Sequence, residues 1–134
     1  MRSRVALVKG SDRRDNIRRA MELIREDVAS RINGQKVIIK PNCLQSAVPL
    51  SCTHVDALRG VLDFLSHLSP ESLMVAESCG DFEHFESFRR LGYVSLPEEY
   101  DVSLVDLEEE DNWVEMHLLN RDYQEVKAKR AQEA

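Results

Sequence analysis

The chain has 134 residues, of which 43% are hydrophobic and 31% are charged, and its formal net charge is −6. This length suits a single domain, and the balance of residues excludes collagen-like, low-complexity and wholly disordered proteins. A general nucleic-acid binder needs an excess of Lys and Arg, so the acidic balance argues against nucleic acid as a partner. No run approaches the roughly 18 apolar residues of a membrane span, and we expect no membrane partner.

The expected location of the chain follows from its first residues and its cysteines. Residues 5–8 form a short apolar run between charged residues, too short for the core of a secretory signal. The three cysteines, an odd number, favour reduced thiols over a disulfide framework. We therefore expect a cytoplasmic protein that folds as one domain over residues 1–134.

The first third of the chain predicts a strand, a helix and a second strand. Residues 4–9 are rich in apolar and β-branched side chains and predict a buried strand. A helix of about four turns is expected next, ended by Asn33 and Gly34, because apolar side chains recur at spacings of three and four: Ile17, Met21, Ile24 and Val28. Residues 36–40 predict the second strand, which Pro41 stops.

A loop without periodicity at residues 42–52 precedes the remaining elements. Thr53 to Asp56 resembles a capping box with Thr53 as the N-cap residue, followed by a helix that extends to about Leu68. Residues 73–76 and 102–106 predict two further strands, separated by a short helix over residues 82–91. Residues 113–119 and 123–128 predict a two-stranded ribbon. The alternation predicts an α/β fold with a mostly parallel sheet, flanking helices and a terminal β-ribbon.

Polar side chains gather where the predicted parallel strands end, which is where open α/β sheets bind ligands. The first two strands are followed by Lys9 and by Lys40 with Asn42, and the later ones end in Glu77 and Asp106. The loop brings Thr53 and His54 to a helix start beside the second strand. Two cations and a helix N-terminus favour an anion.

The sequence therefore predicts binding of a small anionic ligand at this edge. Lys9 and Lys40 would neutralise its charge, Asn42 and Thr53 would orient it, and His54 or Glu77 would carry protons. Each residue also has a purely structural interpretation: a solvated lysine, a turn asparagine, an N-cap threonine, a surface histidine, or an ion-paired glutamate. Whether the chain is an enzyme stays open at this point.

Metal and redox sites are less favoured by the sequence. Five candidate ligands fall in loops or helix starts near the same edge: Cys43, Cys52, His54, Cys79 and His84. No Cys-x-x-Cys spacing occurs, so no metal site is predicted. A ferredoxin-type cluster needs more cysteines than the chain has, and no cofactor is expected. A nucleophilic pair of Cys52 and His54 would lack a third orienting group.

The order of these motifs resembles the bacterial and archaeal domain-of-unknown-function family 362. The resemblance covers residues 5–119. It is carried by residues 5–10, 38–42, 53–57 with 61–62, 75–78, 88–93 and 105–107. The family has no settled activity, and some members carry an iron–sulfur module for which this chain has no motif. The family's motif positions fall on Lys40, Pro41, Asn42, Thr53, His54 and Glu77, while Cys43 and Cys52 depart from its pattern.

The resemblance also raises a rival hypothesis for function. Family domains look longer, and their second half carries a further Lys-Thr-His-like motif and a Lys-Asn pair that this chain lacks. The resemblance thus implies the N-terminal half of such a domain, with an apolar surface that needs a cover. The chain would then be a non-catalytic interaction module, completed by a second polypeptide or by self-association into a homo-oligomer.

Overall fold

The structure, a computed structural model, describes residues 4–78, 85–107 and 113–131. Its centre is a parallel sheet of β1 (Lys36–Ile39), β2 (Ser72–Glu77) and β3 (Ser103–Asp106), in the order β1-β2-β3. The predicted α/β class with a mostly parallel sheet is confirmed. Sequential order with parallel pairing requires crossover connections, and each crossover here contains helix.

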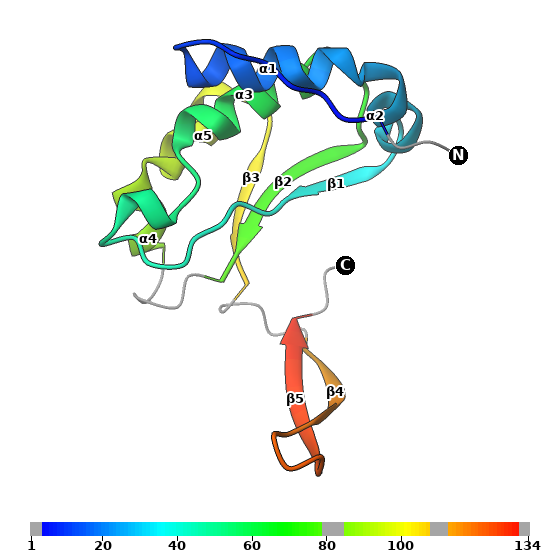
Figure 1. Cartoon of the computed structure of the whole chain (residues 1–134), viewed down its shortest axis with the longest axis vertical. Coiled ribbons are helices and arrows are strands. Elements are labelled where there is room, and N and C mark those ends of the chain that lie inside the picture. Colours follow the sequence, from blue (N-terminus) through cyan, green and yellow to red (C-terminus); the bar gives the residue numbers. More distant parts are fainter. Residues whose placement is uncertain (1–3, 79–84, 108–112, 132–134) are drawn as a thin grey trace.

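Helices cover one side of the sheet (Figure 1). The connection from β1 to β2 contains the short 3-10 helix η1 (Pro49–Ser51) and α3 (Val55–Leu65). The connection from β2 to β3 contains α4 (Glu86–Leu91), the 3-10 helix η2 (Tyr93–Ser95) and α5 (Leu96–Glu99). The core between these helices and the sheet is made of the side chains Cys43, Leu58, Leu62, Val75, Phe88, Tyr93, Leu96 and Val102.

The strand predicted at residues 4–9 is wrong. Residues 4–10 form no helix or strand, and Val5 and Leu7 are each 90% exposed. Side-chain contacts hold the segment instead: Arg4 Nε donates to Asp27 Oδ2 at 2.6 Å, and Asn16 Nδ2 donates to the Gly10 carbonyl at 3.0 Å. The segment thus runs beside the first helices rather than in the sheet (Figure 1).

The long helix predicted next is divided in two. It consists of α1 (Arg13–Leu23) and α2 (Arg25–Ile32), which meet at Ile24, whose φ of −119° is not helical. Asp12 caps α1 by accepting the Asp15 N–H at 2.7 Å. The chain then turns at Gly34, whose φ of +71° favours glycine, as predicted from the Asn33-Gly34 pair.

The predicted ribbon is confirmed as an antiparallel hairpin of β4 (Trp113–Leu119) and β5 (Glu125–Ala131). Asn120 closes its turn, because its side-chain oxygen accepts the N–H groups of Asp122 and Gln124 at 2.9 Å each. Four apolar residues of β4 and one of β5 remain more than a third exposed: Val114, Met116, Leu118, Leu119 and Val126.

The helix predicted at residues 82–91 is confirmed at its end, where Gly92 adopts a φ of +77° directly after α4. Residues 82–84 lie outside the described residues. In the part of the chain that the structure describes, no helix combines the length and the apolar character needed to cross a bilayer.

Candidate functional site at the carboxyl edge of the sheet

The long loop after β1 is closed at its base by two of the predicted site residues. Thr53 N–H donates to the Asn42 carbonyl at 2.7 Å, and Asn42 N–H donates to Thr53 Oγ1 at 2.9 Å. The Asn42 amide also donates to the Ser51 carbonyl, and Cys43 and Cys52 form a one-residue antiparallel bridge. Asn42 and Thr53 therefore use their polar groups to return the chain to the edge at the start of α3.

The N-cap of α3 is His54, so the prediction of Thr53 as the cap is wrong. His54 Nδ1 accepts the Asp56 N–H at 3.1 Å. The hydroxyl of Thr53 is already the acceptor for Asn42, which leaves the next residue to cap the helix. Because Nδ1 accepts, the neutral ring carries its proton on Nε2. The His54 side chain is half exposed.

Lys40 and Glu77 form an ion pair across the edge of the sheet. The Lys40 side chain is 66% exposed, whereas only 7% of the Glu77 side chain is exposed. Glu77 Oε1 also accepts the Ser78 N–H at 3.0 Å. The carboxylate is thus fixed by two donors, and it holds the ammonium group at the surface of the edge.

Asp106 belongs to this edge, although the predicted site omitted it. Glu77 and Asp106 are register partners on β2 and β3, so their side chains share a face of the sheet, and both residues are buried. The Phe85 N–H donates to Asp106 Oδ2 at 3.4 Å. The signal for Asp106 was present in the sequence: it ends a strand as Glu77 does, and parallel strands end at one edge.

Tyr93 is the second residue that sequence reasoning missed. Its ring is fully buried, and its hydroxyl donates to the Thr53 carbonyl. Burial raises the pKa of this phenol, with further increases from the charges of Cys52 and Glu77. Tyr93 thus stays neutral and anchors the closed loop to the core. An aromatic residue after a helix-ending glycine carries no sequence signal for this role.

Replacing Tyr93 with phenylalanine tests this anchor. We expect a loss of about 1–2 kcal/mol in the free energy of unfolding, because the Thr53 carbonyl loses the donor that the buried Tyr93 supplies. Urea denaturation measures the loss, with Tyr123→Phe as the matched control, since Tyr123 lies exposed in the hairpin turn. Equal stability of the two variants would show that the Tyr93 hydroxyl does not anchor the loop.

The structure does not bring Lys9 to the edge. Lys9 lies in the exposed segment before α1, whose Gly10 carbonyl accepts from Asn16. That segment runs beside α1, and the carboxyl ends of β2 and β3 lie at the other end of the body (Figure 1). The sequence placed Lys9 at the edge only because residues 4–9 were expected to be a strand.

The edge residues lie within a region that matches a known family. Residues 37–133 match the model of the family described as "Domain of unknown function (DUF362)". The chain belongs to this family. No curated protein and no solved structure matches the chain. The match to DUF362 includes Lys40, Asn42, Thr53, His54 and Glu77, whereas Lys9 precedes it.

The cysteines of this DUF362 chain differ from the expectation of free thiols. Cys43 is disulfide-bonded, which corrects the expected reduced state for that residue, and Cys52 is a free, half-buried thiol. Cys52 Sγ lies 3.7 Å from Ser51 Oγ, while His54 Nδ1 is occupied by the Asp56 N–H. His54 therefore does not orient Cys52 as a catalytic base would.

Cys79 and His84 lie outside the described residues. Among residues 4–78, 85–107 and 113–131, no group of three or more His, Cys, Asp or Glu could hold a metal ion.

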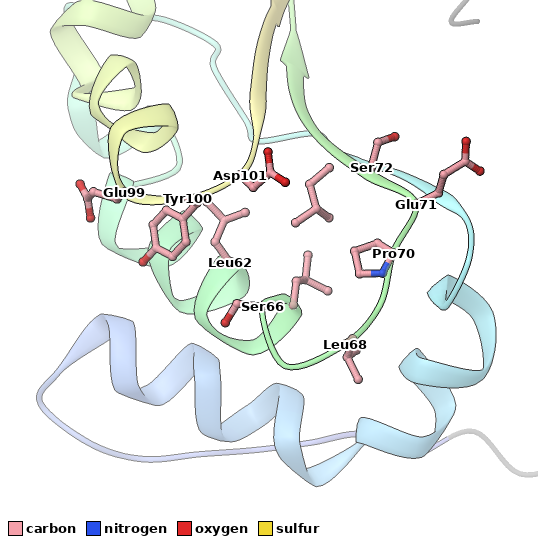
Figure 2. A pocket seen from close by; sticks show the side chains of 11 residues that line it. Leu62, Ser66, Leu68, Pro70, Glu71, Ser72, Glu99, Tyr100 and Asp101 are labelled. Atoms are coloured by element: carbon pink, nitrogen blue, oxygen red, sulfur yellow. The ribbon is translucent and has the colours of Figure 1, made fainter.

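A pocket of about 380 Å³ lies at the opposite, amino end of the sheet (Figure 2). Its lining is apolar residues of α3 and β2 with polar residues around them: Leu62, Leu65, Ser66, Leu68, Pro70, Glu71, Ser72, Leu73, Glu99, Tyr100 and Asp101. None of these residues was predicted as a site residue. With three carboxylates and no cation in its lining, this pocket does not suit the anion predicted for the carboxyl edge.

Proposed function

We propose that the carboxyl edge of the sheet binds a small anionic ligand through Lys40 and the start of α3. The ion pair between exposed Lys40 and buried Glu77 carries this proposal. Glu77 fixes the position of the ammonium group, so a ligand meets a cation whose freedom is already restricted. The half-exposed side chain of His54 supplies a second donor, its Nε2–H group, beside the N-terminus of α3.

The same pair gives the edge a capacity for proton transfer. An anion bound to Lys40 would draw the ammonium group away from Glu77 and leave that buried carboxylate with the Ser78 N–H as its remaining donor. A carboxylate with fewer donors is a stronger base, so Glu77 is the proposed proton acceptor. Asn42 and Thr53 act as positioning residues, because they hold the closed loop that presents His54.

Two lysines at opposite ends of β1, Lys36 and Lys40, provide the test. Lys40 follows the end of β1, and Lys36 begins the same strand at the opposite edge. Inorganic phosphate is titrated into the protein while the NMR signals of the His54 ring are followed. We expect Lys40→Met to weaken phosphate binding about tenfold, the effect of some 1.4 kcal/mol, and Lys36→Met to leave it unchanged. Equal weakening in both variants, or no shift of the His54 signals in the unmodified chain, would refute the site.

As a second candidate, we propose that the chain is an interaction module completed by self-association. The exposed apolar side of the hairpin favours this: Val114, Met116, Leu118 and Val126. The sheet adds Ile38, which is 38% exposed on the face opposite to the core. Isolated two-stranded hairpins are at best marginally stable in water, so a hairpin with an exposed apolar side gains from a partner.

A further inference from the structure

The outer edge of β4 presents an ordered row of backbone hydrogen-bonding groups. Asn120 N–H donates to the Gln124 carbonyl at 2.9 Å, which makes these two residues a hydrogen-bonded pair. Bonded and non-bonded pairs alternate along an antiparallel ladder. The register therefore directs the N–H and carbonyl groups of Trp113, Glu115, His117 and Leu119 away from β5. In the described residues the hairpin sheet has two strands, so no strand pairs with this edge.

We propose that a second copy of the chain pairs with this edge, antiparallel to it, around a two-fold axis at Met116. This inference rests on the proposed self-association and specifies its surface. The axis sets Glu115 opposite the second copy's His117, and Trp113 opposite the second copy's Leu119. These are the residues whose backbone groups point outward, so every outward group within the overlap meets a partner. The interface is isologous and closes at two copies.

The charges on the polar side of the hairpin complement each other in this arrangement. Within one chain, Lys127 Nζ lies 2.6 Å from Glu115 Oε1, and His117 pairs with Glu125. Pairing two β4 strands sets Glu115 directly opposite the second copy's His117. The Lys127–Glu115 pair of one copy, whose members are diagonal neighbours in the register, then lies beside the His117–Glu125 pair of the other copy. No like charges oppose each other across the two β4 strands.

The apolar side of the hairpin is continuous across the same axis. Val114 lies opposite the second copy's Leu118, and the two Met116 side chains meet at the axis. All three side chains are more than a third exposed in one copy. Cross-strand apolar pairs stabilise sheets, so the two-fold arrangement covers part of this surface. The other edge of the hairpin is less suitable, because the second half of β5 carries Lys127, Lys129 and Arg130, whose charges would repel those of another copy.

Two proline substitutions at facing positions test the proposal. His117 and Lys127 are register partners in a pair that is not hydrogen-bonded, so the N–H group of each points away from the other strand. Proline at either position removes one outward N–H group and spares the bonds between β4 and β5. His117→Pro blocks the β4 edge, and Lys127→Pro is the matched control on the β5 edge.

Sedimentation velocity over a concentration series measures association, and cross-strand NMR contacts between Leu118 and Val126 report an intact hairpin. We expect the unmodified chain and Lys127→Pro to dimerise, and His117→Pro to raise the dimer Kd at least tenfold with the hairpin intact. If His117→Pro unfolds the hairpin, Met116→Lys replaces it, because two like charges then meet at the axis and the same tenfold rise is expected. If the dimer Kd is unchanged in His117→Pro with an intact hairpin, or in Met116→Lys where that variant replaces it, the β4 interface is wrong although self-association is retained. A monomer at every concentration overturns both.

Discussion

Replacing Gly60 with alanine should destabilise the chain by about 2 kcal/mol, although alanine is the better helix former. Gly60 lies in α3, where α1 crosses it. A Cβ atom at this position would lie 2.5 Å from the Arg14 carbonyl oxygen and 2.9 Å from Ile17 Cβ. Both atoms belong to the backbone or base of α1 rather than to a flexible side-chain end. The two helices must therefore move apart, and the contacts between them are lost.

Gly10→Ala is the matched control for this prediction. A Cβ atom at Gly10 would also lie close to another atom, 2.2 Å from Asn16 Oδ1, but that atom is the end of a side chain that rotates. We expect a loss below about 0.5 kcal/mol for the control, as for most surface substitutions. Urea midpoints at an unchanged m-value measure both variants. Equal midpoints for Gly60→Ala and the unmodified chain would contradict the close approach of α1 to α3.

The sequence predicted the three strands of the sheet correctly, because each strand has a local sequence pattern that does not depend on distant residues. Residues 36–40, 73–76 and 102–106 are short apolar runs ended by proline or charge, and they match β1, β2 and β3. Residues 4–9 carry the same pattern but no strand pairs with them. A strand needs a neighbouring strand to accept and donate its backbone hydrogen bonds. A short apolar run does not specify which segment of the chain will be that neighbour.

The sequence predicted which edge of the sheet holds most of the candidate residues, but it did not predict the hydrogen bonds that those residues make. The rule that ligands bind where parallel strands end located Lys40 and Glu77 correctly on one edge. It failed for Lys9, because residues 4–9 form no strand and therefore have no strand end at this edge. The roles of Asn42 and Thr53 depend on an eleven-residue separation along the chain, which only the closed loop brings together. Tyr93 joins them from 40 residues away through a single hydrogen bond.

Substitution of Asp63 is the second change for which we expect a large loss of stability, because the Asp63 side chain connects three parts of the fold. It accepts from Arg14 Nε at 2.6 Å, from Arg14 Nη2 at 2.7 Å and from the Tyr100 hydroxyl at 2.8 Å. Arg14 lies in the first turn of α1, Asp63 lies in α3, and Tyr100 follows α5. Hydrogen bonds from Arg14 lower the pKa of Asp63, with a smaller contribution in the same direction from Tyr100, and together they outweigh the effect of burial.

Asp63→Asn should cost about 2 kcal/mol at pH 7. This loss in the free energy of unfolding lies within the range for hydrogen bonds to charged groups. It already includes a reduction for solvent screening, because Arg14 is partly exposed. Glu86→Gln is the matched control, because Glu86 pairs with Arg90 at 3.0 Å within one helix and both side chains are exposed, so about 0.5 kcal/mol or less is expected. A similar loss in both variants would contradict a special contribution from the Asp63 cluster.

The pH dependence of the same variant separates the charge of Asp63 from its shape. A carboxyl group whose pKa is lower in the folded state contributes stability that is complete above its unfolded pKa of about 3.9. That contribution is lost as the pH falls from there through the lowered folded pKa. The free energy of unfolding should therefore fall more steeply below about pH 4 in the unmodified chain than in Asp63→Asn. Glu99 and Asp27, whose pKa values are also lowered by arginine partners, contribute equally to both chains, so the difference between the two curves reports Asp63. Parallel curves would mean that Asp63 acts through packing alone.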